Sequence, residues 1–554
     1  MSQEPDSVET ASTAPPSRPP RTLFGIHPLK VVFAMEYVLQ GLANPFQGIT
    51  YQPFYRHFRT DFGLDEAATQ GMFSKSYLAW SFKPLIGFLI DAYGRTRTLL
   101  VALLSLGVLG YVLTPVVDTG ALIFFGWMFA LSVVMAATDV SVDRATVIAG
   151  DEEARRTGRS KSTTVGLNQA ICWTAIYGTG IVAAVLGGWT SEHVRFSSLM
   201  ECLALVPLAV LVVVLLLPAD RAAAVPLRRS ALAFWNGLNT GPILGVILFY
   251  FVFHFQPAIG PLWNNYLIES LHFTQTQIGL SDGASSLGFF LGVLLFAWKG
   301  VHWQDRIGLR RLFRIYIVIS IAINLTQYAL VDPWFTAVSG TLQHALPFLS
   351  SQTVRVGYMA AYNFLLSIGV SLIRMSTFSL VGAVIPVAAA GSLFAGFMSV
   401  ANLAYSFSYG SGAWLYTHGT EYGLVRGVQT LLFGVRSAPG DELTIGMLIF
   451  IGSVAYLLSF VAVHVLPDRD QTRAAEGISG DYPGPERWGT LSAATRRAVD
   501  ALSVAGGVIC CLAEVSYGDL DPVSAVLITF FGAAMLRKAA LDALLRRRQR
   551  EDHA

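Results

Sequence analysis

The sequence predicts an all-α protein that crosses a membrane many times. Of its 554 residues, 53% are hydrophobic and 13% are charged, and the mean hydropathy is +0.53. Soluble globular proteins carry about 25% charged residues. The apolar residues also form runs of about 20, the length that a helix needs to cross a bilayer. These observations exclude a cytosolic enzyme, a disordered protein and a nucleic-acid binder.

Twelve apolar runs before residue 467 are predicted to be membrane-spanning helices. They lie near 29–52, 69–91, 98–117, 121–149, 163–188, 196–218, 241–266, 278–299, 311–331, 357–386, 390–417 and 443–466. Two shorter runs, near 499–516 and 521–541, favour a helical hairpin and hence fourteen spans. The alternative for these two runs is a pair of amphipathic helices that lie on the membrane surface.

Polar stretches divide the chain into segments. The proline-rich residues 1–27 predict a disordered cytoplasmic tail, and the basic stretch 220–240 predicts a cytoplasmic linker. This linker separates two groups of six predicted spans. The remaining boundaries are those of the first group at 28–219, the second group at 241–466, a further cytoplasmic linker at 467–498, the hairpin at 499–541 and a basic tail at 542–554.

The basic residues predict the orientation. They gather after the second, fourth, sixth and eighth runs, and the positive-inside rule places such connections in the cytoplasm. Both termini are therefore expected to be cytoplasmic. Only six of the 38 basic residues are lysines, and Ala, Val and Gly are abundant. This usage suggests a GC-rich coding sequence, a bacterial source and hence the inner membrane.

A repeated pattern lies at the ends of the second and eighth runs. Asp91, Arg95 and Arg97 close the second run, and Asp305, Arg306, Gly308, Arg310 and Arg311 follow the eighth. Parallel repeats around a shared site are typical of transporters. We expect Asp91, with Arg95 and Arg97, to form a gating contact, since a carboxylate at a helix end can bind arginines and a neighbouring helix N-terminus. A basic anchor that only sets topology is the alternative.

The segment from Gly87 to Arg97 resembles the cytoplasmic signature of the major facilitator superfamily. The pattern Trp-x-x-Lys-Pro-Leu-x-Gly-x-x-x-Asp from Trp80 to Asp91 is similar to the folate–biopterin transporter family, as are the Asp-Val-x-Val-Asp motif from Asp139 and the seventh run from Gln256. The resemblance covers residues 29–466 and implies two six-helix bundles around a central cavity. Asp282, in an otherwise small-residue helix, departs from the family pattern.

Several ionisable residues are predicted deep in the spans. Insertion of each charged side chain at the centre of a bilayer costs about 2.5–3.5 kcal/mol, so such groups usually form ion pairs or face water. Asp139 and Asp143 lie four residues apart on one helix face. Two carboxylates in a dry environment favour protonation of one of them, so Asp139, Asp143 or Glu36 is predicted to couple transport to protons. The alternative is a structural ion pair with Lys83 or Arg144.

Polar and aromatic residues in the spans are candidates for binding the substrate. Those predicted to line the cavity are Glu36, Gln40, Asn44, Gln47, Lys83, Trp173, His254, Gln256, Trp263, Asn264 and Arg374. A folate or pterin suits this chemistry, because its flat ring stacks on aromatic rings and its carboxylates bind cations. Hydrogen bonding between helices is the alternative for single polar residues, and packing is the alternative for the aromatics.

We therefore expect a proton-coupled secondary transporter, a monomer whose partners are a small-molecule substrate, protons and the lipid bilayer. No enzyme activity, cofactor, metal or nucleic acid is expected, because catalytic motifs and metal-ligand spacings are missing and the four cysteines lie within apolar stretches. Two other functions remain open. One is a facilitator-fold exporter of amphiphiles, and the other is a non-transporting receptor or assembly factor with the same fold.

Overall fold

The computed structural model describes residues 27–466 except 160, 218–224, 239–240, 258–259, 332–333, 346–347, 349 and 385–389, together with scattered positions from 492 onward. Within these residues the regular structure is helical, and no strand occurs. The predicted N-terminal tail, the linker up to 491 and most of the hairpin and basic tail lie outside the described residues.

The helices before the predicted linker form a first group. They are α1 (Pro28–Ala43), α2 (Tyr51–Arg56), α3 (Glu66–Ser81), α4 (Lys83–Tyr93), α5 (Thr96–Val117), α6 (Ala121–Thr157), α7 (Lys161–His193), α8 (Phe196–Leu203) and α9 (Leu205–Leu215). Two short turns, η1 (Gly48–Thr50) and η2 (His57–Asp61), flank α2.

The helices after the linker form a second group. They are α11 (Gly241–His254), α12 (Pro261–Glu269), α13 (Gln275–Leu295), α14 (Val301–Ile307), α15 (Leu309–Leu325), α16 (Trp334–Ala345), α17 (Ser351–Val384), α18 (Ala390–His418), α19 (Gly423–Phe433) and α20 (Ile445–Ala462). Each predicted run up to residue 466 falls on one helix or on successive helices. Among the described residues, eight helical stretches are long and apolar enough to cross a membrane, so the chain is a multi-pass membrane protein.

Proline and glycine interrupt two of the predicted spans. The helix that ends at Ser81 resumes at Lys83, where Pro84 occupies a first-turn position that needs no amide donor. The seventh run breaks between α11 and α12, where Gly260 adopts a φ of +93° and Pro261 begins α12. The seventh predicted run is therefore divided into two helices.

Three helices of more than ten residues occupy places where the sequence predicted only linkers or connections. The helix α10 (Leu227–Leu238) lies within the predicted linker 220–240, and α16 and α19 lie in connections between predicted spans. Each has 11 or 12 residues. A search for runs of about 20 apolar residues does not find helices of this length.

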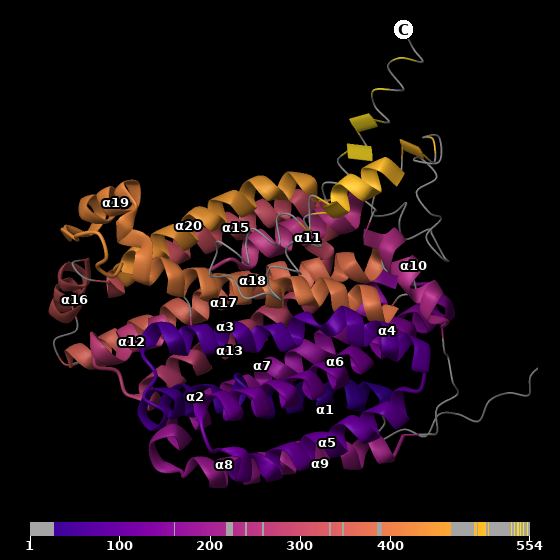
Figure 1. Ribbon diagram of the computed structural model, residues 1–554, viewed down its shortest axis with the longest axis horizontal. Coiled ribbons are helices and arrows are strands. Elements are labelled where there is room, and N and C mark those ends of the chain that lie inside the picture. The colour runs from indigo at the N-terminus through magenta and orange to yellow at the C-terminus, as the bar shows by residue number, and fades with distance from the viewer. Residues whose placement is uncertain are drawn as a thin grey trace, which may run out of the picture.

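The two groups of helices lie side by side (Figure 1). Helices α1, α5, α8 and α9 occupy the lower part of the view, and α11, α15 and α20 the upper part. Between them α7 packs against α13 and α17, and α18 packs against α3 and α4. The interface between the groups is therefore built from long helices of both.

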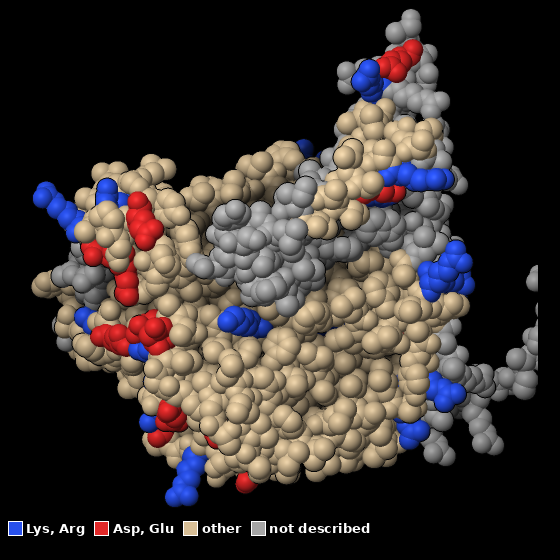
Figure 2. Space-filling view, viewed as in Figure 1, with Lys and Arg blue, Asp and Glu red and all other residues tan. Residues whose placement is uncertain are grey.

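Charged residues gather at two opposite ends of the molecule. Figure 2 shows them at the left and right of the view, with a broad and nearly uncharged surface between. We call the right side, where α4 and α10 lie in Figure 1, the Asp91 end, and the left side, where α2, α12, α16 and α19 lie, the Arg59 end. An apolar surface of this extent is suited to lipid.

The contact between α7 and α13 depends on glycine. A Cβ atom added to Gly279 of α13 would lie 3.2 Å from the Cα of Gly188 and 3.3 Å from the carbonyl carbon of Ala184, both on α7. Small residues let helix backbones approach this closely within a membrane. The close approach therefore fixes how α7 and α13 pack across the interface.

We expect Gly279→Ala to lower the thermal unfolding temperature of the purified protein, because the backbone of α7 must move to admit the methyl group. Overpacking of this kind costs about 1–3 kcal/mol. The matched control is Gly357→Ala in α17, where the space around the position is open. There the higher helix propensity of alanine should leave stability unchanged or raised by up to ~1 kcal/mol. Equal behaviour of the two variants would contradict the close packing.

Candidate functional site

Three carboxylates and one ammonium group lie together inside the first group of helices. Glu36 of α1 and Asp139 and Asp143 of α6 are each at most 2% exposed, and Lys83 of α4 is equally buried. We call these four residues the carboxylate cluster. Lys83 forms an ion pair with Asp139, whose other oxygen accepts a hydrogen bond from Gln40 Nε2 at 2.5 Å. The ion-pair alternative considered for the aspartates therefore describes Asp139.

Asp143 and Glu36 have neutral partners instead. Asp143 Oδ1 accepts hydrogen bonds from the Tyr37 hydroxyl at 2.9 Å and from Gln169 Nε2 at 3.3 Å. Glu36 Oε1 accepts one from the Thr138 hydroxyl at 2.6 Å. The second oxygen of each carboxylate is buried without a hydrogen-bond partner. Buried charges usually require a counter-charge, so this arrangement is suited to holding protons.

A partly buried arginine lies where the two groups of helices meet. Arg374 of α17 donates hydrogen bonds to the hydroxyls of Tyr177 on α7 and Tyr405 on α18. Its guanidinium carbon lies 5.3 Å from the ring centroid of Trp173 and 5.4 Å from that of Phe289. In the part of the chain that the structure describes, no carboxylate lies within 4 Å of it, and its Nε has no partner. The guanidinium thus has aromatic neighbours and no counter-anion.

A glutamine connects the cluster to the arginine. Gln169 of α7 donates to Asp143 and accepts a hydrogen bond from Trp173 Nε1 at 3.2 Å. The Trp173 ring in turn faces Arg374. Gln169 was not among the predicted site residues, although it lies four residues before Trp173 and hence on the same helix face. Tyr37, which follows Glu36 in the sequence, was also not among the predicted site residues.

A cavity of about 260 Å³ lies in the second group of helices, beside Phe289 and Tyr405, which both contact Arg374. His254 and Gln256 line it, together with Phe289, Ser367 and Tyr405. His254 Nδ1 lies 2.8 Å from the Tyr250 carbonyl oxygen, and its Nε2 has no partner. Gln256 Nε2 is also buried and unpartnered. The cavity therefore presents free hydrogen-bonding groups to a solute.

Four of the predicted substrate-binding residues lie apart from this site. Asn44 Nδ2 donates to Gln47 Oε1 at 3.0 Å, in the turn after α1 ends. Trp263 stacks on Tyr266 at 5.6 Å within a separate apolar cluster. Asn264 is 5% exposed, and its Nδ2 has no partner. The structure thus brings together Glu36, Gln40, Lys83, Asp139 and Asp143 around one centre and Trp173, His254, Gln256 and Arg374 around a second.

At one end of the molecule Asp91 connects four helices. Its Oδ1 accepts a hydrogen bond from Arg144 Nε of α6 at 2.9 Å. Its Oδ2 accepts from the Ser230 hydroxyl of α10 at 3.0 Å and from the Ser392 amide, in the first turn of α18, at 3.2 Å. The arginine at this site is Arg144. The predicted Arg97 donates to the Leu215 carbonyl, and Arg95 is exposed.

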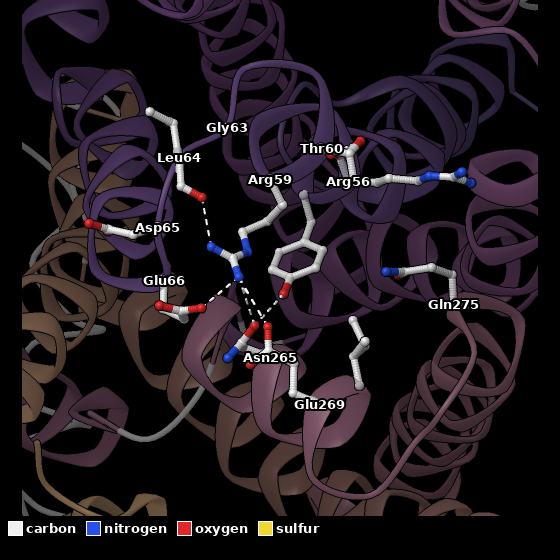
Figure 3. Close-up of a pocket in the computed structure, with 12 residues that line it drawn as sticks. Arg56, Arg59, Thr60, Gly63, Leu64, Asp65, Glu66, Asn265, Glu269 and Gln275 are labelled. Atoms are coloured by element: carbon white, nitrogen blue, oxygen red, sulfur yellow. Dashed lines mark hydrogen bonds and ion pairs between the residues drawn. The ribbon is translucent and has the colours of Figure 1, made fainter.

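At the opposite end Arg59 of η2 contacts both groups of helices (Figure 3). Its guanidinium donates to Glu66 of α3 at 2.5 Å and to Glu269 of α12 at 3.1 Å. It also donates to Asn265 at 3.4 Å, and these residues border a pocket of about 480 Å³. Arg59 was not among the predicted site residues. A basic residue in a connection between spans is evidence for membrane orientation and gives no indication of its contacts.

Comparison with known proteins shows what the chain resembles. A family model described as the BT1 family matches residues 40–481. Among proteins of curated function, none matches the sequence. The crystal structure of the human organic anion transporter MFSD10 (TETRAN) is similar with a TM-score of 0.52 at 12% identity, over 79% of this chain and 98% of that chain. This likeness shows that the two chains share a fold.

A bacterial homologue of the iron transporter ferroportin, in its outward-facing state, matches over the same shares of both chains. Its identity is 14% and its TM-score 0.49.

We expect Asp91→Asn to destabilise the protein, because it leaves the Arg144 guanidinium buried without its charge partner. Breaking a buried pair in this way costs about 3–5 kcal/mol. Thermal unfolding in detergent measures the loss, and the double variant Asp91→Asn with Arg144→Gln should recover part of it. The control is Arg95→Gln, which should stay within about 0.5 kcal/mol of the wild type. Wild-type stability of Asp91→Asn would show that the contact is unimportant.

Proposed function

Because the chain belongs to the BT1 family of folate–biopterin transporters, we propose that it moves a polar, anionic organic solute of the folate or pterin type by alternating access. The family consists of transporters, so the chain is a membrane transporter and not an enzyme. The identity and charge of the solute and the coupling to protons are the parts that this proposal adds.

The observation that carries the proposal is the environment of Arg374. A partly buried cation that has no counter-anion among the described residues is costly, and a solute carboxylate would supply the missing charge. Guanidinium binds carboxylate through two parallel hydrogen bonds. The rings of Trp173, Tyr177 and Phe289 around it would also suit a flat heteroaromatic ring, since aromatic rings stack at these separations.

We propose two six-helix bundles, 28–219 and 241–466, around this site, with the hairpin 499–541 as two further spans. The contacts of Asp91 and of Arg59 at opposite ends support alternating access, since each joins one group of helices to the other. Release of one contact at a time would open the site to one side of the membrane. Cytoplasmic termini, a bacterial inner membrane and a monomeric state complete the proposal.

Proton coupling is proposed at Asp143, with Glu36 and Asp139 in the same cluster. Three carboxylates share one lysine in the carboxylate cluster, so a proton on Asp143 or Glu36 would reduce the uncompensated negative charge. The hydrogen bonds from Asp143 through Gln169 to Trp173 lead to the neighbour of Arg374. A change of protonation at Asp143 would therefore be felt where the anion binds.

We expect Arg374→Gln to weaken binding of an anionic solute about 10- to 100-fold, the effect of losing a charged hydrogen bond of 1.5–3 kcal/mol. Thermal stabilisation of the purified protein by folates, pterins, unrelated anions and amphiphiles measures this, with uptake into proteoliposomes as a second readout. Arg374→Lys should recover only part, because an ammonium cannot bind a carboxylate through two parallel hydrogen bonds. Arg95→Gln is the exposed control.

Stabilisation by amphiphiles alone would favour the exporter, and the absence of uptake with any solute would favour a receptor. Wild-type affinity of Arg374→Gln for the anions would remove the observation on which the proposal depends.

We expect uptake by the wild-type protein to increase as the outside is acidified, and Asp143→Asn to abolish this pH dependence while solute exchange persists. An asparagine at this position accepts no proton but still accepts the hydrogen bonds of Tyr37 and Gln169. Uptake into vesicles over a range of outside pH values measures the effect, and Asp139→Asn is tested in parallel. If both variants keep the pH dependence of the wild type, the proton-coupling proposal is wrong.

A further inference from the structure

A third carboxylate without a cation among the described residues lies at the interface of the two groups of helices. Asp282 of α13 is partly buried, and its one hydrogen bond comes from Gln52 Nε2 of α2 at 3.4 Å. Among the described residues, no Lys, Arg or His lies within ion-pair distance of it. We propose that Asp282, with Gln52 and Asn264, is a binding subsite for an amidine-like donor edge of the transported solute.

Two buried amides beside Asp282 have unused hydrogen-bonding atoms. Gln52 is 2% exposed and its Oε1 has no partner, and Asn264 is 5% exposed and its Nδ2 has no partner. Asp282 and Asn264 are both among the polar groups around the hydroxyl of Tyr51, the residue that directly precedes Gln52. An amidine-like edge carries adjacent donors and acceptors. Asp282 would accept from its donors, and the free amide atoms of Gln52 and Asn264 would pair with the rest of it.

The geometry of α13 places this subsite at a defined separation from Arg374. Asp282 and Phe289 lie seven residues apart, on one face of the helix and about 10 Å apart along its axis. Phe289 lies against the Arg374 guanidinium, and Ser285, one turn from Asp282, lines the 260 Å³ cavity. The wall of the cavity therefore includes one residue that contacts Arg374 and one that lies a helical turn from Asp282.

The site is consequently bipolar. A solute would be held by an anionic group at Arg374 and by a donor edge at Asp282, and a solute with only one of these groups would bind more weakly. This inference rests on the proposed function, which places the anion at Arg374. Asp282 would then select among the anionic solutes that bind at Arg374.

The test compares three probes: folate carries both groups, p-aminobenzoylglutamate carries only the carboxylates, and pterin carries only the donor edge. Binding to the purified full-length protein is measured by calorimetry. We expect Asp282→Asn to weaken folate binding about tenfold, the effect of a lost charged hydrogen bond. Binding of p-aminobenzoylglutamate should be unchanged. Arg374→Gln should show the reverse selectivity, with pterin unaffected.

The control variant is Leu287→Ala, on the exposed side of the same helix, which should bind all three probes as the wild type does. The thermal unfolding temperature of each variant excludes misfolding as a cause. If Asp282→Asn binds folate like the wild type, or weakens folate and p-aminobenzoylglutamate equally, this inference is wrong while the proposed function stands. If the wild-type protein binds none of the three probes, both fail.

Discussion

The ion pair between Lys83 and Asp139 is the interaction on which the polar interior depends. It joins α4 to α6 where an uncompensated charge would cost several kcal/mol. It also uses the one ammonium group of the cluster, and so leaves Asp143 and Glu36 with neutral partners. The difference between the three carboxylates follows from this single pairing. Arg144 cannot take the place of Lys83, since it already forms an ion pair with Asp91.

Across the interface between the two groups of helices lies a cation that has no carboxylate partner among the described residues. Arg374 has tyrosine and aromatic neighbours in place of a carboxylate. An excess of carboxyl groups over cations in the first group of helices thus faces a guanidinium on α17, with Gln169 and Trp173 between them. In a soluble protein water would screen the two, but in a dry interior they influence each other strongly. Occupancy of one centre is therefore expected to change the affinity of the other.

The sequence predicts the helices well and the contacts between them less well. Runs of apolar residues are a property of each segment alone, and so the positions of the long helices could be predicted. Glu36, Gln40, Asn44 and Gln47 were all expected to line the cavity, but α1 ends at Ala43 and Asn44 adopts an extended conformation. The periodicity of a helix no longer applies beyond that point, so only the first two residues reach the cluster.

Other parts of the site depend on pairings between distant segments. Arg144 contacts Asp91, 53 positions away, and Gln52 contacts Asp282, 230 positions away. No spacing within one helix indicates such partners. Trp263 and His254 were both expected to line the cavity, but the helix breaks between α11 and α12, and Trp263 packs in a separate apolar cluster. The nature of the polar residues could be predicted from the sequence, while their partners required the fold.

The glycine contact between α7 and α13 has a mechanical consequence. Where two backbones touch without intervening side chains, the helices can turn about their point of closest approach with little repacking. This contact lies close to the Arg59 end, since Gln275, which begins α13 and borders the pocket beside Arg59, meets Gly188 of α7. A small rotation about it would therefore displace the distant Asp91 end of the interface more than the Arg59 end.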